Sequence, residues 1–101
     1  MDNQKYMNML MVFSRYLDSV VIYWANGMIT KCVSDFGINE TGLNPNDEEY
    51  VGEYYTVVKV VEILENGSDS SILIFNDYIE ISLVNIPNKI ELEDGTVLWE
   101  Q

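Results

Sequence analysis

Apolar residues recur at helical spacing near the start of the chain. Across residues 3–17 they occupy the i, i+3, i+4 and i+7 positions that form one face of an amphipathic helix. The face consists of Tyr6, Met9, Leu10, Phe13, Tyr16 and Leu17, and it is widened by Met7, Met11 and Val12. The spacing therefore predicts a helix over residues 3–17 with a broad buried side.

From residue 20 onward the pattern becomes that of β-structure. Val20–Ala25 is rich in β-branched and aromatic residues. The Asn26-Gly27 pair that follows is typical of a type I′ turn, in which both central residues take positive φ. Tyr54–Leu64 has few breaks and predicts a long strand. In Tyr78–Val84 and Lys89–Glu93 apolar and polar residues alternate, which indicates strands with one face toward water.

One helix followed by strands predicts an α+β fold. We expect the N-terminal amphipathic helix to pack on a curled antiparallel sheet, or a small barrel, of about six strands. With 101 residues the chain is expected to form a single domain, residues 1–101, with its β-region at 20–100. Residues 35–53 interrupt the β pattern with glycines, asparagines and six carboxylates, and they predict a long acidic loop.

The chain is strongly acidic, and its charge is unevenly distributed. Seventeen Asp and Glu face five Lys and Arg, which gives a net charge of -12 at neutral pH. Fifteen of these acids lie in residues 35–101, where the only bases are Lys59 and Lys89. Such a chain repels phosphate backbones and anionic lipid headgroups, so we expect no direct binding to nucleic acid or to membranes.

The sequence lacks two features that many catalytic and metal-binding sites use. There is no His, which is the commonest general base and metal ligand, and no phosphate-cradling glycine motif. Cys32 is the only cysteine, and it is expected to be a small buried apolar residue in a reduced, cytoplasmic protein. The sequence therefore predicts a protein that is not an enzyme, with no cofactor and no metal.

Two groups of acidic residues are candidates for binding a partner. The first lies in and after the long loop, and the second lies on the last hairpin, where Glu80 is expected beside it. Glu91 and Glu93 are two residues apart on a predicted strand, so their carboxylates should project from one face roughly 6.5–7 Å apart, a spacing similar to that of phosphates along DNA. The candidate partner-binding residues are Asp47, Glu48, Glu49, Tyr50, Glu53, Tyr54, Glu80, Glu91, Glu93 and Asp94.

An excess of charge concentrated in one part of a small domain favours a positively charged partner, since solubility needs a net charge of only about 2–8. Our leading hypothesis is a small acidic inhibitor that binds a basic, nucleic-acid-processing protein. Immunity proteins against nuclease toxins and phage inhibitors of restriction or CRISPR nucleases (anti-CRISPR proteins) act in this way. The alternative is a homo-oligomeric structural or adaptor domain whose acidic face merely keeps it soluble. The sequence leaves both a monomer and a homodimer open.

Overall fold

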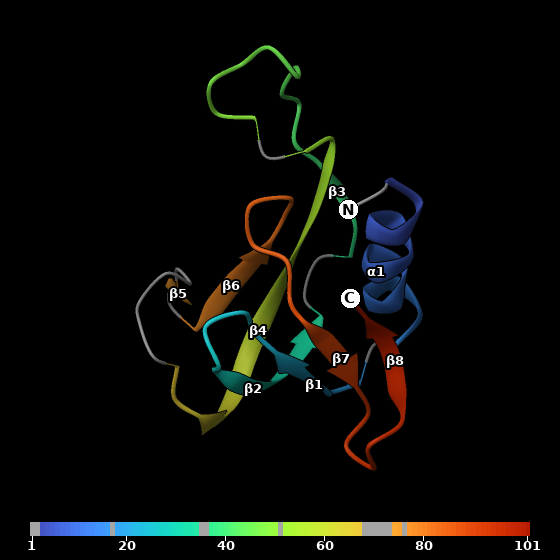
Figure 1. The fold of residues 1–101 in the computed structure, drawn as a ribbon, viewed down its shortest axis with the longest axis vertical. Helices are drawn as coiled ribbons and strands as arrows, with labels where there is room; N and C mark the ends of the chain where they lie inside the picture. The colour runs from blue at the N-terminus through green and yellow to red at the C-terminus, as the bar shows by residue number, and fades with distance from the viewer. Residues whose placement is uncertain (1–2, 17, 35–36, 51, 68–73, 76) are drawn as a thin grey trace.

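The computed structural model describes residues 3–16, 18–34, 37–50, 52–67, 74–75 and 77–101 (Figure 1). A single helix, α1, precedes a series of strands, as the sequence predicts. The elements are α1 (Asn3–Arg15), β1 (Val20–Tyr23), β2 (Ile29–Ser34), β3 (Asn39–Glu40), β4 (Tyr54–Glu65), β5 (Ile74–Phe75), β6 (Tyr78–Ile81), β7 (Lys89–Glu91) and β8 (Val97–Glu100). None of the described helical segments is long and apolar enough to span a lipid bilayer.

The strands form one antiparallel sheet in the order β5-β6-β4-β2-β1-β7-β8, and β3 pairs with the start of β4. Within the described residues, six strands have three or more residues, and β3 and β5 have two each. Register shifts opposite Ile29–Thr30 and opposite Lys31–Cys32 of β2 place bulges in the long strand β4, where Leu64 and Val61 are the extra residues. Because bulges increase local twist, they help the sheet to curl around the helix. The predicted α+β class, with a helix on a curled antiparallel sheet, is confirmed.

The core lies between α1 and the concave face of the sheet. The helix buries its predicted apolar face, and its large fully buried side chains include Met9, Leu10 and Phe13. From the sheet they meet Ile22, Ile79, Ile81 and Ile90, among other residues. Two side chain to backbone hydrogen bonds also join the helix to the sheet. Tyr6 Oη donates to the Tyr54 carbonyl (2.7 Å), and Trp99 Nε1 donates to the Lys5 carbonyl (3.1 Å).

The predicted helix is slightly too long, since α1 ends at Arg15, Tyr16 is 40% exposed and Leu17 lies outside the described residues. The Met-rich side of the helix is covered: Met9 is buried, and Met7 and Met11 are half-buried. A methionine face left exposed on this helix would favour the structural or adaptor alternative, because methionine surfaces adapt to partners. The helix does not provide it.

Of the two tight hairpins, the first differs from the predicted turn geometry. In the first, Trp24 N donates to the Met28 carbonyl, and Gly27 N donates to the Trp24 carbonyl. The loop therefore has three residues, and Gly27 takes φ 89° while Asn26 does not take positive φ, so the predicted type I′ turn is wrong. The Asn26 side chain instead accepts a hydrogen bond from Met28 N (2.9 Å). This is the local turn bonding for which Asn and Asp are favoured.

The last hairpin has the same design. Leu92 N donates to the Thr96 carbonyl, Gly95 takes φ 93°, and Asp94 Oδ1 accepts from Thr96 N (2.9 Å). Strand β7 therefore ends at Glu91, two residues before the predicted end. The strand predicted over Tyr78–Val84 is likewise cut short.

β6 ends at Ile81 because the backbones of Ser82 and Asn85 close a tight turn. In that turn Leu83 and Val84 are left exposed. The alternation that predicted β6 is correct for the strand itself, where Ile79 and Ile81 are buried and Glu80 is exposed.

Candidate functional site

The predicted long loop is a projecting hairpin connection between β3 and β4. Residues 41–50 and 52–53, here called the acidic arm, extend beyond the body of the molecule along its longest dimension (Figure 1). At the base of the arm Thr41 N donates to the Glu53 carbonyl (2.8 Å), and Thr41 Oγ1 donates to the Gly52 carbonyl (2.6 Å). These bonds continue the β3–β4 pairing and close the arm where it leaves the sheet. Asp35, Phe36 and Val51 of the predicted loop lie outside the described residues.

Local turns shape the tip of the arm. Asp47 N donates to the Asn44 carbonyl (2.9 Å) in a four-residue turn that has Pro45 at its second position, where proline is favoured. The Asp47 carboxylate accepts a hydrogen bond from Asn44 N (2.8 Å) and fixes the same turn. Glu48 and Glu49 follow it and are exposed. Three carboxylates therefore stand together at the end of a projecting hairpin.

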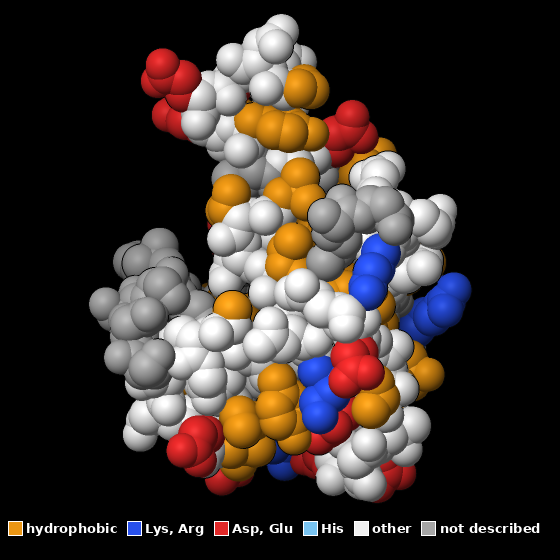
Figure 2. Space-filling view, viewed as in Figure 1, with side chains coloured by type: hydrophobic (Ala, Val, Ile, Leu, Met, Phe, Trp, Pro, Cys, Tyr) orange, Lys and Arg blue, Asp and Glu red, His pale blue; other side chains and the backbone are white. Residues whose placement is uncertain are grey.

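No Lys or Arg lies between Lys31 and Lys59 in the sequence, so the arm contains no cation to offset its charge. On the face seen in Figure 2, acidic side chains sit on the projecting arm, and Lys and Arg side chains lie on the body below it. The acids of the arm are thus separated from the Lys and Arg residues in space as well as along the sequence.

A cleft of about 200 Å³ lies where the arm meets the helix, and we call it the tyrosine cleft. Tyr6 and Met7 of α1 form one side, and Tyr50, Glu53 and Tyr54 of the arm and β4 form the other, with Leu83 also in the lining. A second hollow, of about 320 Å³, lies on the arm between Glu40 and Glu53. Three of the predicted site residues therefore line one cleft.

The sequence placed Tyr6 on the buried face of the helix and did not mark it as part of a site. Tyr6 is 3% exposed, and burial raises the pKa of its phenol to about 12, with smaller contributions from the charge of Glu80 and from Tyr50. Glu80 is exposed on β6 and is not in the lining of the tyrosine cleft. In the sheet, Glu80 is separated from the last hairpin by β4, β2 and β1, so its expected place beside Glu91 is wrong.

The raised pKa of Tyr6 gives a specific alkaline signature. The unfolded phenol loses its proton near the ordinary value of 10.0, whereas the folded phenol keeps it to about 12, so the stabilisation is complete below pH 10 and is lost as pH rises through 12. Tyr6→Phe should lower the free energy of unfolding by about 1 kcal/mol at neutral pH, because the Tyr54 carbonyl loses its hydrogen bond. In urea titrations the gap between variant and wild type should shrink above pH 10.

Tyr16→Phe, at an exposed position just after the end of the same helix, is the control for general effects of alkali and should follow the wild type. A gap for Tyr6→Phe that stays constant across this pH range would contradict the buried, hydrogen-bonded phenol.

The acids of the last hairpin have partners within the chain. Glu93 forms an ion pair with Lys31 and accepts from Ser19 Oγ (3.2 Å), and both contacts lower the pKa of its carboxyl, the lysine most strongly. Glu91 accepts from Tyr23 Oη (2.6 Å) and lies 3.5 Å from Lys89 Nζ. Asp94 fixes the turn through Thr96 N, which lowers the pKa of Asp94. This second group is therefore less free to meet an outside cation than the tip of the arm.

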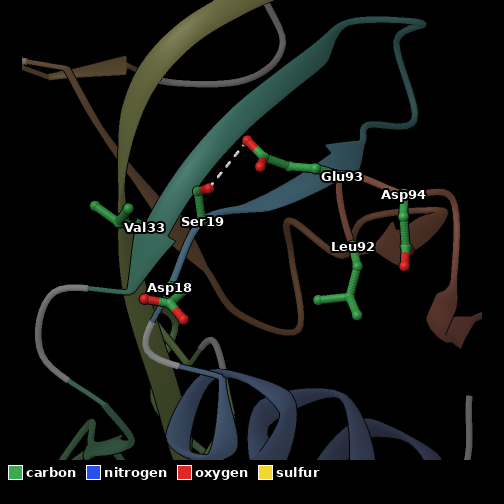
Figure 3. A pocket seen from close by; sticks show the side chains of 6 residues that line it. All are labelled: Asp18, Ser19, Val33, Leu92, Glu93 and Asp94. Atoms are coloured by element: carbon green, nitrogen blue, oxygen red, sulfur yellow. Dashed lines mark hydrogen bonds between the residues drawn. The ribbon is translucent and has the colours of Figure 1, made fainter.

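An open groove of about 620 Å³ runs beside that hairpin, lined by Asp18, Ser19, Val33, Leu92, Glu93 and Asp94. Figure 3 shows the Glu93 carboxylate directed at Ser19, while Asp18 and Asp94 point elsewhere. In the described part of the chain no group of three or more Asp, Glu or Cys residues is arranged to hold a metal ion. The three carboxylates of this groove do not converge on a common point.

Comparison with protein families assigns the whole chain. The model of the family described as cognate immunity protein YxxD matches residues 1–101. The chain belongs to this family. An immunity protein of this kind has a cognate toxin as its binding partner. Searches of curated proteins and of solved structures found no match.

Membership in the YxxD family agrees with one of the inhibitor classes expected from charge and size, the immunity proteins. The role follows from the match over the full chain, whereas the binding surface has to be inferred from the geometry. Among the described residues, the arm and the tyrosine cleft combine exposed charge with aromatic area, and both lie at the same end of the molecule.

Proposed function

We propose that this chain neutralises a cognate toxin that acts on nucleic acid, by laying the acidic arm against the toxin's basic substrate groove. The observation that carries the proposal is the projection of Asp47, Glu48 and Glu49 into solvent on a hairpin without a single Lys or Arg. A protein that processes nucleic acid must present cations to phosphates, and the same cations would attract this arm. Inhibition then needs no catalysis, since the bound arm occupies the place of the substrate.

The residues of the acidic arm and the tyrosine cleft have two different roles, long-range attraction and direct contact. The carboxylates at the tip pair with Arg and Lys side chains of the toxin or stand in for phosphates, and they accelerate encounter through complementary charge. Tyr50 and Tyr54 supply aromatic area next to them, and buried aromatic contacts slow dissociation. Glu91, Glu93 and Asp94 have internal partners, so we assign them to the long-range negative field rather than to direct pairing.

The test is a variant in which Asp47→Asn, Glu48→Gln and Glu49→Gln are combined. Asn at position 47 keeps an acceptor for Asn44 N, so the turn of the tip is preserved. The association rate with the cognate toxin, measured by surface plasmon resonance at low salt, should fall roughly tenfold or more. Protection of nucleic acid from the toxin should fall in parallel. Wild-type binding should itself weaken steeply as salt is raised.

The matched control carries Glu62→Gln, Glu65→Gln and Glu100→Gln. It removes the same number of charges from exposed positions outside the arm and should bind almost as fast as the wild type. Equal losses in the two variants would show that only net charge matters and would overturn the role of the arm. A cognate toxin that leaves DNA and RNA intact would overturn the nucleic-acid part of the proposal.

A further inference from the structure

The tyrosine cleft has the size of a site for one long side chain. Its volume of about 200 Å³ lies below the range of about 300–1,000 Å³ that is usual for pockets that bind small molecules. Its walls come from two elements far apart in the sequence, the first turns of α1 and the segment around Glu53. The hydrogen bond from Tyr6 Oη to the Tyr54 carbonyl holds these walls together.

The floor of the cleft is fixed before any partner binds. Gly52 takes φ 106°, a conformation that other residues rarely adopt, and a Cβ atom at this position would lie only 2.9 Å from Leu83 Cγ. The backbone of the arm therefore packs directly on Leu83, which is one of the residues in the cleft lining. A preformed cleft loses less ordering entropy when it is filled.

The chemistry of the lining is aromatic and anionic. Glu53 is exposed at the edge of the cleft, the charge of Glu80 reaches Tyr6 inside it, and no Lys or Arg is among the described lining residues. An apolar side chain would displace water from the Glu53 carboxylate without offering it a hydrogen bond, and an anionic side chain would be repelled by its charge. A planar cation suits both the aromatic rings and the carboxylate of the lining. Guanidinium groups stack on aromatic rings, and they bind carboxylates through two parallel hydrogen bonds.

We propose that the tyrosine cleft receives an arginine side chain of the cognate toxin. The guanidinium stacks against Tyr50 or Tyr54 and bonds the Glu53 carboxylate, and the aliphatic stem lies along Met7 and Leu83. This proposal rests on the proposed function, since it adds an anchoring contact to the surface that attracts the toxin. The carboxylates at the tip of the arm then attract the toxin over a distance, and the cleft binds it by direct contact.

The experiment uses the full chain and Nα-acetyl-arginine methylamide as the probe, without the toxin. Amide chemical shifts in NMR spectra should change around residues 3–7, 50–54 and 83 as the probe is added. The citrulline analogue, which has the same shape but no charge, should leave these shifts unchanged. Glu53→Gln should weaken binding of the arginine probe roughly three- to tenfold, and Tyr50→Leu should also weaken it.

Glu62→Gln removes an equal charge from an exposed position of β4 outside the arm and is the matched control, which should bind the arginine probe like the wild type. The proposal is overturned if the shift changes spread over all exposed acids, if citrulline gives the same changes, or if Glu53→Gln and Glu62→Gln behave alike. Because no toxin is present, these outcomes are independent of the arm-tip variant. The NMR experiment can therefore contradict the arginine site while the arm-tip variant still supports the role of the arm in association. The opposite combination of results can be distinguished in the same way.

Discussion

Phe13→Ala is expected to lower the free energy of unfolding by about 3–5 kcal/mol. The Phe13 side chain has no exposed surface and belongs to the face of α1 that packs on the sheet. Its removal deletes apolar contacts and leaves a cavity that the curled sheet can fill only in part. Since domains of this size have total stabilities of about 5–15 kcal/mol, the variant should be close to unfolding at room temperature.

Urea unfolding followed by circular dichroism measures this loss. Ser14→Ala changes the next residue of the helix, which is exposed, and should shift the stability by no more than about 0.5 kcal/mol. A loss below about 1 kcal/mol for Phe13→Ala would be incompatible with a helix docked at the centre of the core.

Thr30→Val is expected to destabilise the fold by about 1–3 kcal/mol although it changes the shape of the side chain very little. Thr30 is fully buried, and its hydroxyl oxygen accepts a hydrogen bond from Trp24 Nε1 (2.9 Å) and lies 3.0 Å from Cys32 Sγ. Valine keeps the volume but leaves the indole N–H without an acceptor in a region closed to water. The loss therefore measures an unsatisfied donor rather than a cavity.

A double-mutant cycle with Trp24→Phe separates these causes. Phenylalanine has no N–H, so Thr30→Val should be less destabilising in that background than in the wild type. Thr30→Ser keeps the hydroxyl and should preserve the bond at the expense of one methyl group. If Thr30→Val has the same effect in both backgrounds, the hydrogen bond to Trp24 contributes nothing to stability.

The fold class was predicted correctly because the helix and the strands that define it are encoded by patterns within short segments of the sequence. The spacing of apolar residues identified α1, and the alternation around Ile79 and Ile81 identified β6. The pairing of β1 with β7 was not foreseen, since it joins residues nearly seventy positions apart and no short motif encodes it. The type I′ turn at Asn26-Gly27 was wrong because Asn can also stabilise a three-residue loop through its side chain.

The candidate site was predictable only in part, for a similar reason. Turn-forming residues and carboxylates in residues 44–49 predict an exposed acidic segment whatever the fold is, and the structure has one. The pairing of Glu93 with Lys31 depends on which strands are neighbours, so the sequence alone overstated the free charge of the last hairpin. The inclusion of Tyr6 in the cleft depends on where the arm returns to the helix. Its only signal in the sequence was a phenol hydroxyl on a buried helix face, which needs a partner.

The bonds between Thr41 and the Gly52–Glu53 segment isolate the arm from the rest of the molecule. Beyond this closure, residues 44–49 are exposed and take no part in the core. Changes in sequence there are consequently free of the constraints that packing imposes on the body. Under the proposed function, changes in this segment would alter toxin specificity while the scaffold is kept. Exchange of the segment between family members should transfer specificity without disturbing folding.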